Sequence, residues 1–119
     1  MAYSIDTIAQ LLQAERIGNS EGTIKWLLTD SRSLGFPEET LFFALVTGRG
    51  DGHRYIADLY NRGVRHFVVS KRLSAEELQS MPEANFLVVE DTLSALQLLA
   101  EKHRIRHEIA VVGITGRNG

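Results

Sequence analysis

Short apolar segments alternate with helical patterns along almost the whole chain, and this alternation limits the possible folds more than any other feature. Five segments are typical of strands buried in a sheet: residues 23–29, 41–46, 64–69, 86–89 and 109–114. Helical patterns or helix-capping signals lie between most of them. Strands that alternate with helices predict an α/β domain, with a small, mainly parallel sheet and helices on both of its faces.

The predicted helices carry recognisable boundary signals. Ser4 can cap the first helix, and Gly63 stands where a C-terminal cap of the second helix belongs. Ser74 and Glu77 fit the capping box S-x-x-E, and Asp91 can cap the last helix. We therefore expect helices over residues 5–14 and 54–62, a short one that follows residue 74, and a longer one that follows residue 91.

The composition excludes several classes of function. The chain has 119 residues, a formal net charge of −2 and no cysteine. This charge creates no global field that would hold nucleic acid or an anionic membrane, so we expect neither as a partner. The lack of thiols excludes disulfides, thiolate zinc sites and cysteine catalysis. The N-terminus does not resemble a secretory signal, and no apolar stretch reaches the ~20 residues of a membrane helix.

One basic cluster consists of Lys102, His103, Arg104, Arg106 and His107. It is the only candidate for a nucleic-acid surface, but we place it at the end of the last helix, where cations suit the helix dipole. His103 and His107 also have the spacing of metal ligands on a helix, yet no carboxylate completes a strong site. We therefore predict no metal centre.

Three polar segments follow predicted strands: Asp30-Ser31-Arg32, residues 47–53 and residues 115–119. If the strands are parallel, all three segments share one edge of the sheet. Ligands of open α/β sheets bind at that edge, beyond the carboxyl ends of the strands. The convergence predicts a binding site.

The first segment supplies a carboxylate, a hydroxyl and a guanidinium. These groups of Asp30, Ser31 and Arg32 could read a nucleobase, hold a ribose or bind a phosphate. The alternative is an Asx turn, in which Asp30 binds the backbone two residues on and Arg32 is solvated. On spacing alone we favour the turn.

The other two segments are rich in glycine. Residues 48–53, GRGDGH, could cradle an anion, or they could form a flexible connection in which Asp51 only caps the next helix. His53 could contact a ligand phosphate, but we favour a surface position without such a contact. Residues 113–119, GITGRNG, offer backbone N–H groups to an anion but lack the lysine of a phosphate-binding loop, so a plain glycine turn is the alternative.

Together these motifs resemble one family. They are TDSR at residues 29–32, LFFAL at 41–45, DGH at 51–53 and GITGRNG at 113–119. The order is similar to that of the Mur ligases, the ATP-dependent amide ligases of peptidoglycan synthesis. The resemblance implies an N-terminal UDP-substrate-binding domain over residues 1–108. It also implies that residues 109–119 are the first strand and the truncated phosphate loop of the ATPase domain.

Within this family the chain is most similar to the ligases that add D-alanyl-D-alanine to the UDP-N-acetylmuramoyl-tripeptide. One alternative is the group of ligases that add a diamino acid as the third residue of the peptide. Another is a non-catalytic α/β scaffold domain. In some bacteria the D-alanyl-D-alanine ligase is fused to an alanine racemase, and the sequence leaves that origin open.

The resemblance also implies roles for single residues. The UDP end of a UDP-N-acetylmuramoyl-peptide would meet two loops, made of Asp30, Ser31 and Arg32 at the uridine and of Thr47, Gly48, Asp51, Gly52 and His53 nearer the diphosphate. The ATP loop would include Thr115, Gly116, Asn118 and Gly119. ATP and Mg²⁺ would serve the complete cytoplasmic ligase, whose remaining domains would be partners of this one. By itself the chain would catalyse nothing.

Overall fold

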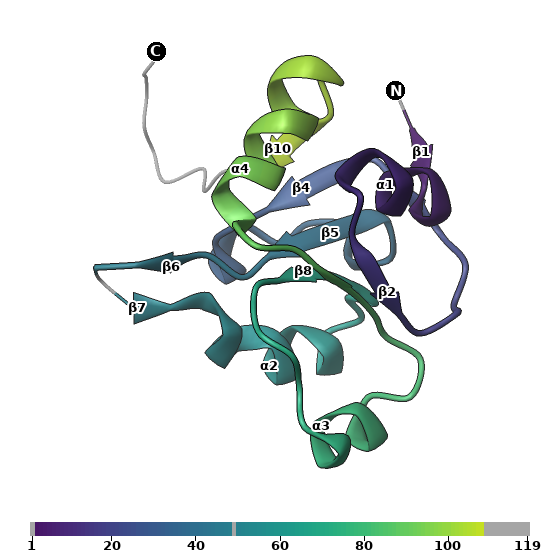
Figure 1. Ribbon diagram of the computed structural model, residues 1–119, viewed down its shortest axis with the longest axis vertical. Coiled ribbons are helices and arrows are strands. Elements are labelled where there is room, and N and C mark those ends of the chain that lie inside the picture. Colours follow the sequence, from purple (N-terminus) through teal and green to yellow (C-terminus); the bar gives the residue numbers. More distant parts are fainter. Residues whose placement is uncertain (1, 49, 109–119) are drawn as a thin grey trace.

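The computed structural model describes residues 2–48 and 50–108, which form a six-stranded sheet between two layers of helices (Figure 1). The strand order is β10–β4–β5–β8–β9–β2, and every neighbouring pair is parallel except β9 with β2. The strands are β2 (Glu15–Ile17), β4 (Trp26–Leu28), β5 (Thr40–Phe43), β8 (His66–Val69), β9 (Asn85–Val88) and β10 (Arg106–Glu108). The predicted fold class, a mainly parallel sheet covered on both faces, is confirmed.

Helices and short irregular elements complete the domain. The helices are α1 (Ile5–Leu12), α2 (Ile56–Asn61), α3 (Ala75–Ser80) and α4 (Thr92–Gln97), which continues as a wider π-helical segment over Leu98–Lys102. Two antiparallel pairs join β1 (Tyr3–Ser4) to β3 (Thr23–Ile24) and β6 (Val46–Thr47) to β7 (Gly50–Asp51). Single 3₁₀ turns span Ser31–Ser33, Pro37–Glu39 and Gly52–Tyr55. Within the described residues, no helix has the length and apolar character needed to cross a membrane.

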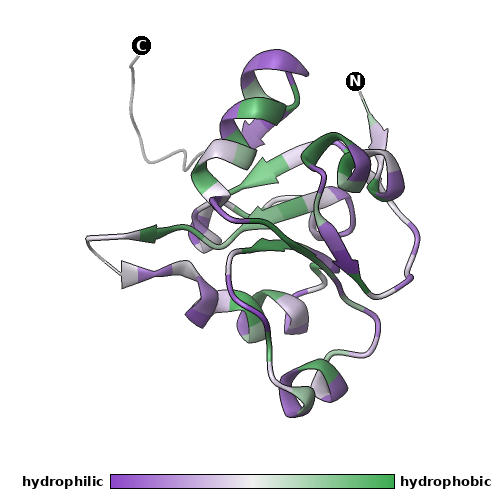
Figure 2. Ribbon diagram, in the orientation of Figure 1, coloured by the Kyte–Doolittle hydropathy of each residue, from purple (hydrophilic) through white to green (hydrophobic). Residues whose placement is uncertain are grey.

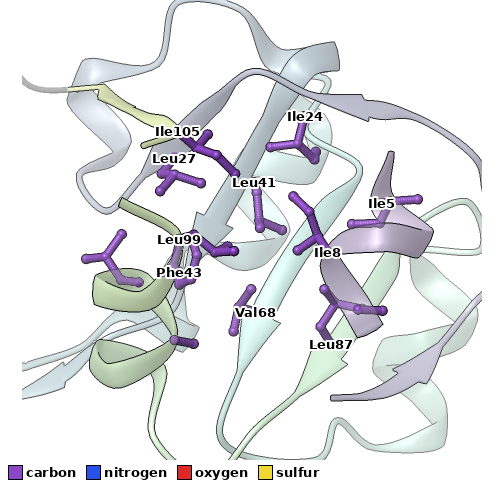
Figure 3. Close-up of a cluster of buried hydrophobic side chains, with 13 residues drawn as sticks. Ile5, Ile8, Ile24, Leu27, Leu41, Phe43, Val68, Leu87, Leu99 and Ile105 are labelled. Carbon is purple, nitrogen blue, oxygen red and sulfur yellow. The ribbon is translucent and has the colours of Figure 1, made fainter. Parts of the chain in front are cut away.

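The central strands bury side chains on both faces, which is why the sequence shows them as continuous apolar runs. On β5, Leu41 and Phe43 join the core beneath α1 and α4, as the close-up in Figure 3 shows. Phe42, between them, joins the second core, on the α2 side, and stands edge-on to Phe67 of β8. Figure 2, coloured by hydropathy, shows that the central strands are apolar and that the outer turns are largely polar.

The capping signals read from the sequence are present. Ser4 accepts a hydrogen bond from the Thr7 backbone N–H at 3.1 Å, and Asp91 accepts one from the N–H of Leu93 at 3.0 Å. Ser74 and Glu77 form the complete capping box of α3. α1, α3 and α4 therefore begin directly after their capping residues, although α1 ends at Leu12, two residues earlier than expected. The second helix, expected from residue 54, begins only at Ile56, after the 3₁₀ turn Gly52–Tyr55.

Strand β2 was not predicted from the sequence. It follows α1 after Gln13, whose left-handed backbone (φ 53°) turns the chain back toward the sheet. Arg16 then pairs with Leu87 of β9 at the outer edge. An edge strand of this kind is largely polar (Figure 2), so it lacks the apolar run that identifies a buried strand.

The prediction that the basic cluster ends a helix is wrong for two of its members. The helical segment ends at Lys102, and Arg106 and His107 lie in β10, paired with β4. The Arg106 guanidinium lies 5.8 Å from the ring centre of Trp26, and the His107 Nε2 atom lies 2.9 Å from the Thr29 hydroxyl. These contacts with β4 and its exit loop account for the extended conformation. The strand predicted over residues 109–114 lies outside the described residues.

Candidate functional site

The loops that leave β4, β5, β8 and β9 lie at one edge of the sheet, here called the carboxyl edge. Parallel pairing places the ends of these four strands side by side, at Leu28, Phe43, Val69 and Val88. The β6–β7 hairpin extends from this edge (Figure 1). The first two polar segments singled out in the sequence therefore share one edge, as their position after parallel strands required.

The first loop forms the Asx turn that the sequence favoured. The Asp30 carboxylate accepts a hydrogen bond from the Arg32 backbone N–H at 2.9 Å. The Arg32 guanidinium also donates to both carboxylate oxygens, over 2.8–3.2 Å. These bonds from Arg32 hold the pKa of Asp30 below its usual range. The Arg32 side chain is 82% exposed, so this ion pair can exchange for another partner at little cost.

The first and second loops are neighbours. Arg62, which follows α2, donates a hydrogen bond to the Ser31 carbonyl at 3.1 Å. The 3₁₀ turn Gly52–Tyr55 leads directly into α2, so the first loop contacts the end of the helix that follows the second loop.

Asp51 and Gly52 fix the base of the second loop. Asp51 caps the 3₁₀ turn by accepting the His53 backbone N–H at 2.9 Å. The Gly52 N–H donates to the Leu45 carbonyl at 2.7 Å. A Cβ at residue 52 would stand 2.8 Å from the Leu45 nitrogen, so only glycine fits. Gly48 differs, because a Cβ there would meet nothing within 4 Å.

The prediction that His53 occupies the surface is wrong. Its side chain is only 14% exposed, and both ring nitrogens have partners within the protein. Nδ1 lies 2.5 Å from the Asp51 carboxylate, and Nε2 accepts the Ser70 backbone N–H at 3.2 Å. The His53 ring therefore joins the loop that follows β5 to the loop that follows β8.

The Asp51 carboxylate has bonding partners on two different loops. Besides its two bonds from His53, it contacts the ammonium group of Lys71, which lies just beyond β8. Lys71 and then the His53 bonds hold the pKa of Asp51 well below its usual range. The carboxylate is therefore ionised at neutral pH and engaged on both oxygens.

A pocket of about 180 Å³ opens between the hairpin and the start of α4. Its walls are Leu45, Val46, Thr47, Ser70, Glu90, Asp91, Thr92 and Leu93, and we call it the rim pocket. Val46 and Leu93 are 55% and 48% exposed, which leaves apolar surface open to a ligand. The buried Thr92 hydroxyl donates to the Ala44 carbonyl at 3.1 Å and so fixes the start of α4 against β5.

Of the residues that line this pocket, the sequence had suggested only Thr47 as a site residue. Ser70, Glu90 and Leu93 were not named as candidates, although Ser70 directly follows one predicted strand and Glu90 another. Their position in the sequence could have identified Ser70 and Glu90, because residues just beyond parallel strands lie at the same edge of the sheet. It was overlooked because these residues carry no glycine-rich or charged motif of their own.

A second cavity, of about 290 Å³, lies between α2 and α3. Lys71 and Arg72 contribute to its lining, but they already pair with Asp51 and Glu15. Within residues 2–48 and 50–108, no three His, Asp or Glu side chains gather as metal ligands. Thr115, Gly116, Asn118 and Gly119, predicted for ATP, lie outside the described residues.

Comparison with known proteins places this chain in a family. No family model matches the chain. It is 34% identical over 112 residues, 94% of its length, to a UDP-N-acetylmuramoyl-tripeptide–D-alanyl-D-alanine ligase of Haemophilus influenzae. It is 28% identical over 86% of its length to a UDP-N-acetylmuramoyl-L-alanyl-D-glutamate–2,6-diaminopimelate ligase of Clostridium perfringens. The chain spans 23% and 20% of the lengths of these relatives.

The fold leads to the same proteins. The crystal structure of MurF from Acinetobacter baumannii matches 84% of the chain with a TM-score of 0.64 and 30% sequence identity, over 20% of its own length. The sequence motifs, the arrangement of strands and these relatives agree. The chain belongs to the Mur ligase family.

Proposed function

We propose that this chain is the domain that holds the UDP end of a UDP-N-acetylmuramoyl-peptide in an ATP-dependent ligase of peptidoglycan synthesis. The observation that carries the proposal is the meeting of the Asp30–Arg32 loop, the β6–β7 hairpin and the rim pocket at one sheet edge. Relatives named for UDP-N-acetylmuramoyl substrates support it.

We assign the uridine to the loop of Asp30, Ser31 and Arg32, and the diphosphate to the hairpin at Thr47 and Gly48. The open space around Gly48 supports this assignment, since no internal packing requires a glycine there and a ligand could approach its backbone closely. The amino sugar then lies over the half-exposed Val46 of the rim pocket.

Two exposed cations at this edge can neutralise the diphosphate. The side chains of Arg32 and Lys71 are 82% and 59% exposed, and each is held by a carboxylate, Asp30 or Asp51. Exposed ion pairs contribute little stability, so either cation can turn to a phosphate without a large loss. The carboxylates meanwhile keep both cations at the edge when no ligand is bound.

The proposal extends to the organisation of the whole enzyme. Residues 1–108 form the N-terminal UDP-substrate domain, and residues 109–119 begin the ATPase domain. In the complete ligase, ATP would activate the carboxylate of the UDP-linked peptide as an acyl phosphate, and an amine would then displace the phosphate. The residues described here contribute to binding and orientation of the UDP end only.

We propose D-alanyl-D-alanine as the group that the complete enzyme adds. The similarity to the Haemophilus influenzae ligase and to MurF supports this choice. Addition of a diamino acid is the second candidate, favoured by the similarity to 2,6-diaminopimelate ligases. Both kinds of ligase act on UDP-N-acetylmuramoyl substrates by name, so the role proposed for this domain is the same in either case.

Two-dimensional ¹H–¹⁵N NMR of the chain, titrated with UDP-N-acetylmuramic acid, tests the proposal. We expect shifts at Ser31, Thr47, Gly48 and Ser70, and with uridine alone we expect shifts at the Asp30–Arg32 loop only. ADP at equal concentration is the control for unspecific attraction of a nucleotide. The proposal fails if millimolar ligand shifts no resonance, or shifts only residues at the opposite edge, such as Arg16 and Gly22.

A further inference from the structure

We infer that His53 is a positioning residue of the UDP site, which holds the β6–β7 hairpin in place and does not itself touch the ligand. This inference rests on the proposed function and changes the role that the sequence motif suggests for the histidine. It follows from the hydrogen bonds of the His53 ring, from the pairing within the hairpin and from the burial of the side chain.

The hydrogen bonds of His53 fix its tautomer. The backbone N–H of Ser70 can only donate, so the Nε2 atom 3.2 Å away must be an unprotonated acceptor. The proton of the neutral ring then lies on Nδ1, where it is donated to the Asp51 carboxylate at 2.5 Å. Both nitrogens are thus satisfied within the protein, and neither is available to a phosphate.

Because Asp51 belongs to the hairpin, its bond with the His53 ring also holds the hairpin in place. Asp51 pairs with Val46 across the hairpin, and Gly50 pairs with Thr47. Two short strands alone are marginally stable in water, so the hairpin depends on its attachments. The attachment at Gly52 joins its base to Leu45, and His53 joins it to the next strand.

The His53 ring lines the cavity between α2 and α3, not the rim pocket, but its bonds connect two walls of the rim pocket. Val46 and Thr47 line the pocket on the hairpin side, and Ser70 lines it on the side of β8. By bonding both Asp51 and Ser70, His53 sets the distance between these two walls. A phosphate contact would require the ring, which is 14% exposed, to give up at least one of these partners.

Two substitutions separate the two bonds of the ring. In His53→Asn, the side-chain amide can still donate to Asp51 but does not reach Ser70. In His53→Gln, the longer side chain can accept from Ser70 N–H and gives up the bond from the Nδ1 position. We expect His53→Asn to weaken UDP binding about tenfold and His53→Gln to weaken it less, because the bond between the two loops is the important one.

The experiment measures three quantities: the ¹⁵N shifts of the His53 ring, hydrogen exchange of the Thr47 and Gly50 amides, and UDP affinity by NMR titration. We expect a protonated Nδ1 and an unprotonated Nε2, both with and without UDP. We also expect faster amide exchange in His53→Asn than in His53→Gln, even without ligand. Lys25→Gln, far from this edge in an exposed ion pair with Glu39, is the control variant.

Three results would overturn the inference: the opposite tautomer, a ring whose nitrogen shifts change markedly when UDP binds, or equal hairpin exchange in both variants and the unaltered chain. Absence of any UDP binding to the unaltered chain would instead refute the proposed function. The tautomer and the exchange rates would still decide whether His53 positions the hairpin, so the two failures are distinguishable.

Discussion

Two histidines lie in polar networks at opposite edges of the sheet, and their surroundings differ in charge and burial. His53, at the carboxyl edge, faces the Asp51 carboxylate and joins two loops. His66, at the amino end of β8, is 2% exposed and accepts a hydrogen bond from the buried Asn85 amide at 3.1 Å. The first network joins segments that we propose to contact the ligand, whereas the second joins segments at the amino edge.

Within the described residues, the groups that shift the pKa of His66 are cationic, whereas His53 bonds a carboxylate. Burial, together with the positive charges of Arg16 and Arg65, lowers the pKa of His66 from 6.5 to about 4. The Asn85 amide also donates to the Ser20 carbonyl at 2.6 Å, as does the Arg16 guanidinium. His66 is therefore an uncharged structural residue at neutral pH. Its hydrogen-bond network connects β8, β9 and the segment around Ser20 at the amino edge.

The largest effect expected from this difference is a loss of stability in acid. Below pH 6.5 the unfolded chain protonates His66 while the folded chain does not, down to about pH 4. Stability due to the neutral ring is fully present above pH 6.5, and about 3 kcal/mol is lost by pH 4. Urea unfolding at a series of pH values measures this slope. In His66→Asn, which keeps an acceptor for Asn85 but does not titrate, most of the slope should vanish; an unchanged slope would contradict the assignment.

The next largest effect concerns the base of the hairpin. Gly52→Ala places a Cβ 2.8 Å from the Leu45 nitrogen and should cost about 2 kcal/mol of unfolding free energy, with weaker UDP binding. Gly50→Ala is the matched control, because a Cβ there meets nothing within 4 Å. Chemical denaturation compares the two variants, and equal stability would show that the hairpin is not anchored at Gly52.

A third substitution separates ligand contact from stability. Gly48→Ala should leave unfolding free energy within about 0.5 kcal/mol of the unaltered chain, since space surrounds this residue. If the diphosphate approaches its backbone, the added methyl group should weaken UDP binding about tenfold, or 1.4 kcal/mol. NMR titration measures the affinity. Unchanged UDP affinity would show that the diphosphate does not bind beside Gly48.

The smallest effect on stability is expected at the first loop. Arg32→Gln removes an ion pair whose guanidinium is 82% exposed, and should change unfolding free energy by less than about 0.5 kcal/mol. Because the freed cation is proposed to serve the ligand, UDP affinity should still fall about threefold. Lys25→Gln removes an equal charge elsewhere and should leave affinity unchanged. Equal affinities of the two variants would exclude Arg32 from the site.

Sequence patterns predicted the parts of the molecule whose residue types are restricted by burial or capping. β5 was visible because both of its faces are buried, and α3 because Ser74 and Glu77 form a capping box. The edge strands β2 and β10 were missed because polar side chains such as Arg16 and Arg106 suit an exposed edge. These two strands are defined by their pairing with a neighbouring strand, and the periodicity of the sequence carries no information about that pairing.

The candidate site was predictable in position but not in the roles of its residues. The rule that loops share an edge after parallel strands brought Asp30 and Asp51 to one side of the domain. The bond between His53 and Ser70 joins residues 17 positions apart in the chain, and no local pattern announces it. The sequence alone does not distinguish a histidine that binds a ligand from one that stabilises a loop. The neighbours of the ring in the folded protein distinguish these two roles.

A crystal structure of the chain with UDP-N-acetylmuramic acid tests the central claim most directly. The account predicts UDP at the carboxyl edge, with the uridine beside Ser31, the diphosphate beside Thr47 and Gly48, and His53 still bonded to Ser70. UDP bound in the cavity between α2 and α3, or at the amino edge beside Arg16, would contradict it.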